Sequence, residues 1–230
     1  MRIDRIPCLF VLGALAWALS SLPVAALAQG LLDDLAVAVA NDRTDEVRRL
    51  LARGMDPDSV DANGETMLCI AARSGSVGAA QLLLDAKAKP DKPNRWNDTP
   101  LMLAALQGNL DVVRALVAAK ANVNPNGWTP LIYAATGGHD AVATFLLQRG
   151  ADINAVSPNG TTALMMAIRE HRLDTARLLI GRGADVNHRN QDGASAIDWA
   201  RRGLSEAAPC RDDARESPSS RRSCHSATRH

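Results

Sequence analysis

Residues 97–106 read N-D-T-P-L-M-L-A-A-L, and variants of this stretch recur along the chain. The triplet Thr99-Pro100-Leu101 has counterparts at spacings of 33, 30, 33 and 33 residues, in a series that begins at Thr66 and continues through Thr129, Thr162 and Ser195. Two residues before each triplet stands Gly or Asn, the residue types that tolerate a left-handed backbone conformation. A period of about 33 residues predicts a solenoid of stacked repeats.

Each triplet predicts the start of a short helix. Its Thr or Ser suits the N-cap, and Pro100 and Pro130 fall at the first helical position, where a missing N–H costs nothing. Small residues such as Ala104-Ala105 follow on the packing face. A turn and a second, amphipathic helix complete each copy, and that helix ends in pairs such as Leu83-Leu84.

These patterns resemble the ankyrin-repeat family. The T-P-L triplet, the double alanine, the turn glycine and the G-A-D-[VI]-N ending, as in Gly150–Asn154, match in phase over about residues 31–203. The resemblance implies an all-α solenoid of helix–turn–helix repeats with short β-hairpin fingers. Within a domain spanning residues 29–203, we expect a capping repeat at 31–54, with Asp42 at its turn, and four helix-pair repeats. A terminal half repeat at 195–203 follows, and the turn of the fourth pair falls at His171.

Three departures from the family pattern have structural consequences. The finger between Asn124 and Gly127 is three residues short, so we expect it to be stunted. The last repeat lacks a recognisable second helix, although a terminal cap normally shields the end of a stack. The His usual after T-P-L is replaced, mostly by apolar residues, so we expect packing in place of its hydrogen bonds: Cys69, Met102, Ile132, Met165 and Asp198.

The two ends of the chain differ from the repeats. Arg2 and Arg5 precede the apolar run Cys8–Leu19, and Ala26-Leu27-Ala28 offers small residues where a signal peptidase cuts. This pattern predicts a signal peptide over residues 1–28, cleaved after Ala28, and a periplasmic or secreted location. An uncleaved anchor is the competing reading, but twelve apolar residues are short of the roughly 20 that span a bilayer. Residues 204–230 are polar, and we expect a disordered tail.

Composition excludes several classes of protein. The chain is 47% hydrophobic but only 3% aromatic, which argues against a β-rich fold. Its 26 basic and 25 acidic residues give a net charge of +1, so nothing in the charge indicates a nucleic-acid partner. We also expect no membrane span after signal cleavage, and a monomer.

No pattern of residues indicates catalysis. Metalloprotease, hydrolase, phosphate-loop and dinucleotide motifs do not occur, so we expect neither an enzyme nor a cofactor. Cys210, Cys224, His225 and His230 fit no closed zinc site, although a Cys210–Cys224 disulfide is chemically possible. Cys69 reads as a small buried hydrophobe. The remaining histidines read as surface residues rather than ligands: His139, His171 and His188.

The resemblance places partner binding at the finger tips and the adjacent ends of the first helices. Trp96 and Trp128 carry most weight, because exposed Trp and Arg are enriched at binding hot spots. The alternative is that each Trp only covers the neighbouring finger. Tyr133, Phe145 and Trp199 are assigned to the core. The predicted partner-binding residues are Arg73, Arg95, Trp96, Asp98, Gln107, Trp128, Arg169 and Glu170, with Asn63, Glu65 and Ser74 at adjoining variable positions.

The function that these patterns predict is that of an exported, non-catalytic protein which binds a partner protein through its concave face. The alternative from another class is an immunity-type inhibitor of an exported toxin or hydrolase. A third reading, an enzyme or redox protein that uses Cys69 or the tail cysteines, is the least favoured.

Overall fold

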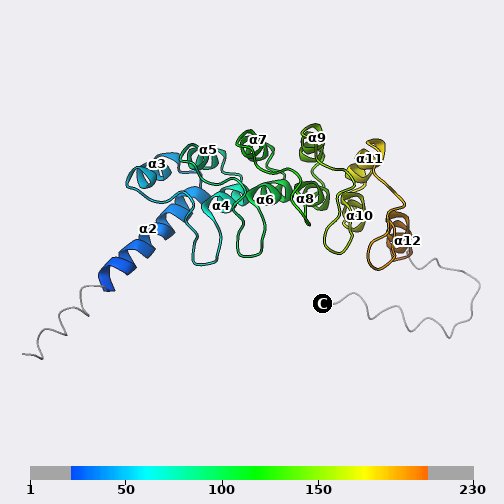
Figure 1. Cartoon of the computed structure of the whole chain (residues 1–230), viewed down its shortest axis with the longest axis horizontal. Coiled ribbons are helices and arrows are strands. Elements are labelled where there is room, and N and C mark those ends of the chain that lie inside the picture. Colours follow the sequence, from blue (N-terminus) through cyan, green and yellow to red (C-terminus); the bar gives the residue numbers. More distant parts are fainter. Residues whose placement is uncertain (1–21, 207–230) are drawn as a thin grey trace, which may run out of the picture.

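The computed structural model describes residues 22–206, with side chains from residue 30 to residue 202. Eleven helices form within this range, and Figure 1 shows them arranged as an elongated stack. Their bounds are α2 Leu22–Ala40, α3 Thr44–Ala52, α4 Met67–Ser74, α5 Val77–Asp85, α6 Pro100–Gln107, α7 Leu110–Ala118, α8 Pro130–Gly137, α9 Asp140–Gln148, α10 Ala163–Arg169, α11 Leu173–Gly181 and α12 Ala196–Glu206. The predicted all-α solenoid is confirmed.

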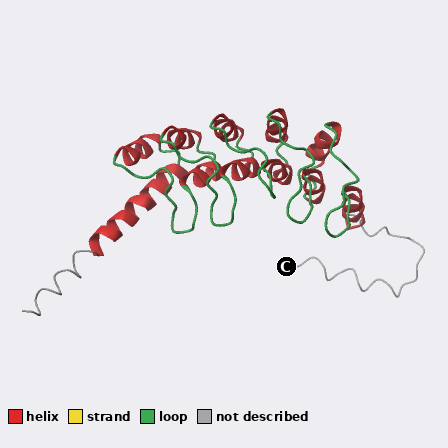
Figure 2. Ribbon diagram, viewed as in Figure 1, coloured by secondary structure: helices red, strands yellow, loops and turns green. Residues whose placement is uncertain are grey.

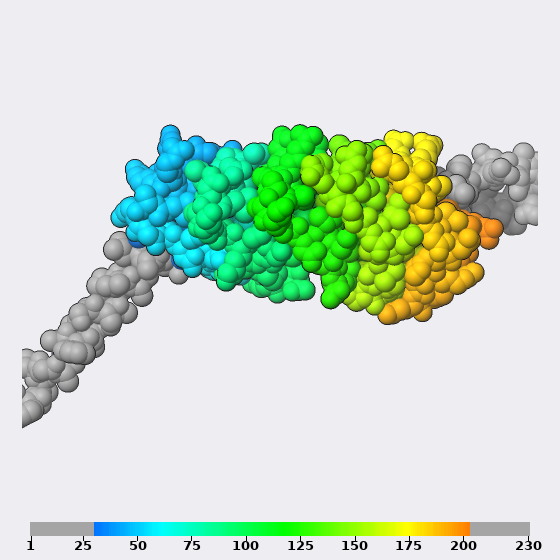
Figure 3. Space-filling model, turned by 45° about the horizontal axis from the view of Figure 1, so that its top comes forward, coloured from blue at the N-terminus to red at the C-terminus, as the bar shows by residue number. Residues whose placement is uncertain are grey.

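The helices lie in two layers. The even-numbered helices from α4 to α12 pack side by side as the first helices of their repeats, and α3, α5, α7, α9 and α11 form the second layer. In the space-filling view each repeat forms its own band along the stack (Figure 3). Alanines such as Ala104, Ala105 and Ala134 are wholly buried between first helices, so small side chains allow close packing.

The helix starts follow the predicted capping chemistry. The hydroxyl of Thr99 accepts a hydrogen bond from the N–H of Met102 at 3.3 Å, and Thr66, Thr129 and Thr162 make the equivalent bond. The turns also lie where the sequence places them, because Asp42, Asn97 and His171 hold the left-handed conformation with φ of 52°, 67° and 55°. Capping threonines therefore start the first helices, and left-handed residues form the turns at the positions that the sequence predicts.

The loops that join successive repeats project from the layer of first helices as fingers (Figure 2). Within residues 22–206 they form no strand, so the expected β-hairpins are reduced to single antiparallel bridges, Val60–Thr66, Val156–Thr162 and Arg189–Ser195. We number the fingers from the N-terminus as residues 55–66, 88–99, 121–129, 151–162 and 184–195. Neither the second finger nor the third, which is the short one, has such a bridge.

Side-chain to backbone hydrogen bonds tie each repeat to the next. Along the finger bases, Asp58, Asp91, Asn124 and Asn154 accept from the N–H groups of Lys89, Asn122, Asp152 and Asp185 at 2.8–2.9 Å. At the turns, side chains donate to a carbonyl of the preceding first helix: Ser76 to Ala40, Asn109 to Ala72, His139 to Leu106 and Arg172 to Thr136. Neighbouring repeats are thus joined at both edges.

Two histidines were misplaced by the sequence reading. His139 and His188 are half-buried ties between repeats, each donating a ring N–H at 2.9 Å, to the carbonyls of Leu106 and Gly160 respectively. They therefore link successive repeats, whereas the sequence alone indicated solvent-exposed side chains without such a role.

Some of the residues that replace the family His still make polar contacts. Ile132 and Met165 are buried as expected, but the sulfur of Met102 accepts from the N–H of Thr99 at 3.4 Å. The thiol of Cys69 donates to the carbonyl of Asp98 at 3.7 Å. Sulfur atoms therefore retain part of the polar contact that packing was expected to replace.

The C-terminal edge of the stack is uncovered in the described part of the chain. Leu173, Ile180 and Ile197 are exposed there, whereas Leu164, the residue equivalent to Ile197 in the preceding repeat, is buried. Asp198 stabilises the start of α12, because its carboxylate accepts from the N–H of Ser195 at 3.0 Å and from its hydroxyl at 2.8 Å. In return, the Ser195 hydroxyl accepts from the N–H of Asp198 at 3.3 Å.

Acid is expected to loosen α12. Hydrogen bonds from Ser195 hold the pKa of Asp198 below its usual value near 3.8, so this carboxylate stabilises the helix above that pH and loses its effect as the pH falls through the lowered pKa. Amide hydrogen exchange between pH 5 and pH 2, corrected for intrinsic rates, should show protection in α12 falling relative to α8. In Asp198→Asn this relative fall should disappear; a fall of unchanged size would contradict the assignment.

The chain ends need a separate description. The predicted signal peptide lies mostly outside the described residues, and only its last part, Leu22–Ala28, falls in α2. Nearly all of the predicted polar tail, with Cys210, Cys224, His225 and His230, also lies outside them. Among the helices that the structure describes, none has the length and apolar character needed to cross a bilayer.

Candidate protein-binding surface

The second finger is shaped by one buried amide. The side-chain oxygen of Asn94 accepts from the N–H groups of Trp96 at 3.0 Å and Asp98 at 2.9 Å, which closes the finger tip as a tight turn. Asp61 does the same in the first finger, where it accepts from Asn63 and Glu65. Both tips are therefore held in a defined shape by their own side chains.

Trp96 is exposed at the tip of the second finger. The residue is 55% exposed, and the guanidinium of Arg95 lies over the ring, 4.2 Å from its centroid. Arg95 is placed by the first finger, because its N–H donates to the Gly64 carbonyl at 2.9 Å and its stem covers Gly64. A Cβ on Gly64 would lie 2.7 Å from Cδ of Arg95, so only glycine allows this contact.

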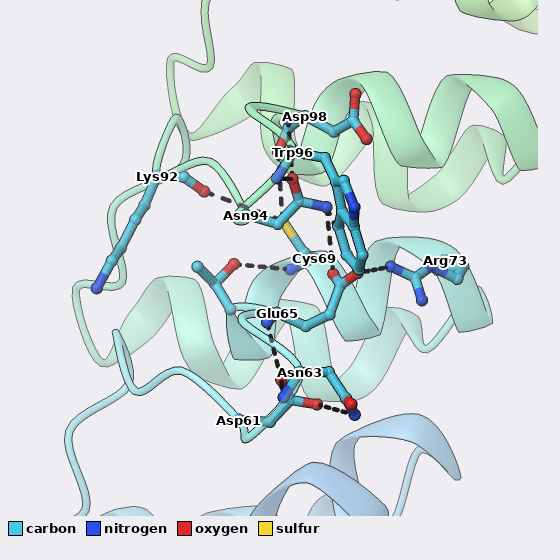
Figure 4. Close-up of polar contacts among 10 residues, drawn as sticks. Asp61, Asn63, Glu65, Cys69, Arg73, Lys92, Asn94, Trp96 and Asp98 are labelled. Carbon is cyan, nitrogen blue, oxygen red and sulfur yellow. Dashed lines mark hydrogen bonds and ion pairs between the residues drawn. The ribbon is translucent and has the colours of Figure 1, made fainter.

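Beneath Trp96 lies a buried carboxylate. Glu65 is only 3% exposed, although its finger position suggested a variable surface residue. It accepts from the guanidinium of Arg73 and from the Asn94 amide at 3.4 Å, so the buried charge is paired. Figure 4 shows Trp96, from the second finger, standing beside the Glu65–Arg73 pair. The predicted residues Arg73, Arg95 and Trp96 therefore line one hollow.

A second hollow adjoins the short third finger. Trp128 is 37% exposed and meets Tyr133 edge to face, with ring centroids 6.1 Å apart. Leu106, Thr136 and Met166 complete a largely apolar hollow of about 170 Å³. Because the third finger is three residues shorter than its neighbours, it covers less of the adjacent first helices than the other fingers do.

Tyr133 was assigned to the core but is half-buried and lines this second hollow. Its hydroxyl donates to the carboxylate of Asp98, a predicted binding residue. Burial raises the pKa of Tyr133, and the bond to the charged Asp98 raises it further, so the phenol stays protonated. Asp98 therefore positions the Tyr133 ring, and its carboxylate is already engaged.

Phe145 and Trp199 also differ from the sequence assignment. Each is half-buried and packs against the core without being enclosed by it. Phe145 lies on a second helix, away from the fingers, with the guanidinium of Arg149 4.9 Å from its ring centroid. It thus packs beneath charged side chains of the outer layer.

The other predicted binding residues lie at the ends of first helices. Gln107 is exposed at the end of α6, and Arg169 is exposed at the end of α10, 3.6 Å from Glu170 in an ion pair. None of these three lines either hollow. The structure therefore groups the predicted residues into two hollows and a separate pair of helix ends.

Cys69 has the environment of a structural thiol. It is fully buried on α4, and burial raises its pKa to about 11. A thiolate is the reactive form, so this thiol stays protonated at neutral pH. Among the described residues, no group of three or more His, Cys, Asp or Glu side chains is placed to hold a metal ion.

Comparison with known families agrees with the repeat pattern. The chain matches the family model described as "Ankyrin repeats (3 copies)" over residues 79–157, 118–190 and 146–208. It also matches the model described as "Ankyrin repeats (many copies)" over residues 34–84. Among curated proteins, no sequence matches this chain.

Proposed function

Since the chain belongs to the ankyrin-repeat family, whose repeats are generally protein–protein interaction modules, we propose that it binds a partner protein through its fingers and first-helix ends without catalysing a reaction. The observation that carries this proposal is the exposure of Trp96 and Trp128. Both rings stand on fingers, and each borders a hollow that holds other predicted binding residues or their direct partners.

The chemistry of these hollows suits a protein partner. Trp and Arg bury large areas at modest entropic cost and dominate binding hot spots. Trp96 with Arg95 and Trp128 with Tyr133 are such groups, and both pairs are held by contacts within the chain. A surface already fixed in shape loses little entropy when a partner binds.

Export to the periplasm is the second part of the proposal. The first residue that packs on the core of the described chain is Leu31, and α2 places Leu35, Ala38 and Val39 wholly within it. Cleavage after Ala28 would keep all of these contacts. Removal of the predicted signal peptide is thus compatible with the repeat fold.

A pull-down from periplasmic extract tests the binding surface. Wild-type protein should retain a partner that Trp96→Ala/Trp128→Ala loses, because removing two hot-spot side chains typically costs about 2 kcal/mol or more each. Leu173→Ala is the matched control, since Leu173 is exposed on α11 and away from both hollows. Retention that the double substitution leaves unchanged would show that this surface is not the binding site. An activity assay of the captured protein then separates a scaffold from an inhibitor.

A further inference from the structure

The hollow beneath Trp96 has a volume of about 490 Å³ and is built by four segments of the chain. Its apolar side comes from Val37 on α2, which is 52% exposed, Ile70 on α4 and the Trp96 ring. Its polar side holds Glu65, Arg73 and Arg95. Two large exposed apolar side chains, Val37 and Trp96, therefore face one hollow with charged groups beside them.

The two carboxylates in this hollow, those of Asp61 and Glu65, already accept hydrogen bonds from the chain itself. Both oxygens of Asp61 take hydrogen bonds, from the N–H groups of Asn63 and Glu65 and from the Asn63 amide. Glu65 accepts from Arg73 and from Asn94. The negative charge of Glu65 is already paired with Arg73, so a cationic ligand such as a lysine side chain would share that carboxylate with an internal guanidinium.

The donors, in contrast, have capacity left. A guanidinium carries five N–H donors, and Arg73 uses one nitrogen on Glu65 while its side chain remains 47% exposed. In the described part of the chain, the guanidinium of Arg95 has the face of Trp96 as its neighbour and no hydrogen-bonded or ion-paired partner. Its stem is nevertheless held over Gly64. The hollow thus presents two placed guanidinium groups beside an apolar surface.

We propose that this hollow binds an acidic segment of the partner protein in which an aliphatic residue stands next to a carboxylate. The aliphatic side chain packs against Val37, Ile70 and Trp96, and the carboxylate accepts from Arg73 and Arg95. Guanidinium and carboxylate match in charge and geometry, which makes this the complementary group. The proposal rests on the proposed function and specifies the chemistry of the partner.

Fluorescence polarisation with defined peptides tests the proposal. The probe is a dye-labelled decapeptide in which one leucine is flanked by glutamates in a serine and glycine background; its control carries glutamine for every glutamate. Wild type should bind the glutamate peptide at least about tenfold more tightly than the glutamine peptide, because hydrogen bonds to charged groups are the stronger ones. This preference should shrink as salt is raised.

Arg95→Gln is the decisive variant, because the Arg95 guanidinium has no polar partner whose loss would disturb the fold. It should weaken binding of the glutamate peptide about tenfold, and Trp96→Ala should weaken binding of both peptides. Arg177→Gln, on the outer helix α11, is the matched control and should bind as wild type does. Equal binding of the two peptides by wild type, no binding of either, or full affinity in Arg95→Gln would overturn the proposal.

The captured partner separates this inference from the function on which it rests. One outcome is loss of the partner in Trp96→Ala/Trp128→Ala with full retention in Arg95→Gln. That result would support the proposed binding surface and contradict the proposed acidic segment. If the partner is retained by all these variants, the binding surface itself fails. Displacement of the partner by the glutamate peptide, and not by the glutamine peptide, would support both.

Discussion

Leu131→Ala is expected to lower the free energy of unfolding by about 3–4 kcal/mol, near the middle of the range for leucines truncated in a core. Leu131 is 1% exposed on α8, in the middle of the stack, and α8 packs against both α6 and α10. The cavity would therefore weaken two interfaces between repeats. Urea denaturation followed by far-UV circular dichroism measures the loss.

Leu173→Ala is the matched control for this loss. Leu173 is 59% exposed on α11, so the same truncation should change the free energy of unfolding by less than about 0.5 kcal/mol. A loss below about 1 kcal/mol in Leu131→Ala would show that the centre of the stack can collapse around the cavity. Equal losses in the two variants would contradict the assignment of core and edge.

Gly137→Ala should destabilise the fold by about 2 kcal/mol, although alanine is the better helix former by about 1 kcal/mol. A Cβ at Gly137 would lie 2.4 Å from Cδ2 of His139 and 2.6 Å from the backbone oxygen of Leu106. His139 cannot move aside freely, because its ring donates to that same oxygen. The substitution therefore forces two repeats apart or breaks their hydrogen bond.

Gly181→Ala supplies the comparison for Gly137→Ala. Gly181 also ends a helix, α11, but an added Cβ there meets no atom of the described chain within 4 Å. Alanine at this position should be neutral or stabilising by up to about 1 kcal/mol. Thermal and urea unfolding of the two variants should move in opposite directions, and a stabilised Gly137→Ala would contradict the close contact.

The features that sequence predicted well are those that depend on neighbouring residues. Thr99 before Pro100 caps its helix through a local hydrogen bond. The repeat period likewise marks Asp42, Asn97 and His171 as turn positions, and all three adopt the left-handed conformation. The short third finger follows from a count of residues. None of these features depends on how distant side chains meet.

The features that sequence missed arise between repeats. Glu65 is buried because the second finger lies across it, and Tyr133 is half-buried because it meets Trp128 and Asp98 from other segments. One signal was available: the residue after each turn has a side chain that can donate a hydrogen bond, and it recurs at nearly the same period. These donors are Ser76, Asn109, His139 and Arg172.

The hydrogen-bonded ties along the finger bases also determine how the molecule bears load. Each of these hydrogen bonds joins one repeat only to the next, from Asp58 and Lys89 through to Asn154 and Asp185. A force applied along the stack is therefore transmitted from each repeat to its neighbour. In the described part of the chain no further repeat covers α12, so under a pull from the C-terminal end we expect it to detach before any inner repeat does. We then expect the stack to unfold one repeat at a time, with the surface between the first and second fingers, near the other end, among the last parts to lose its shape.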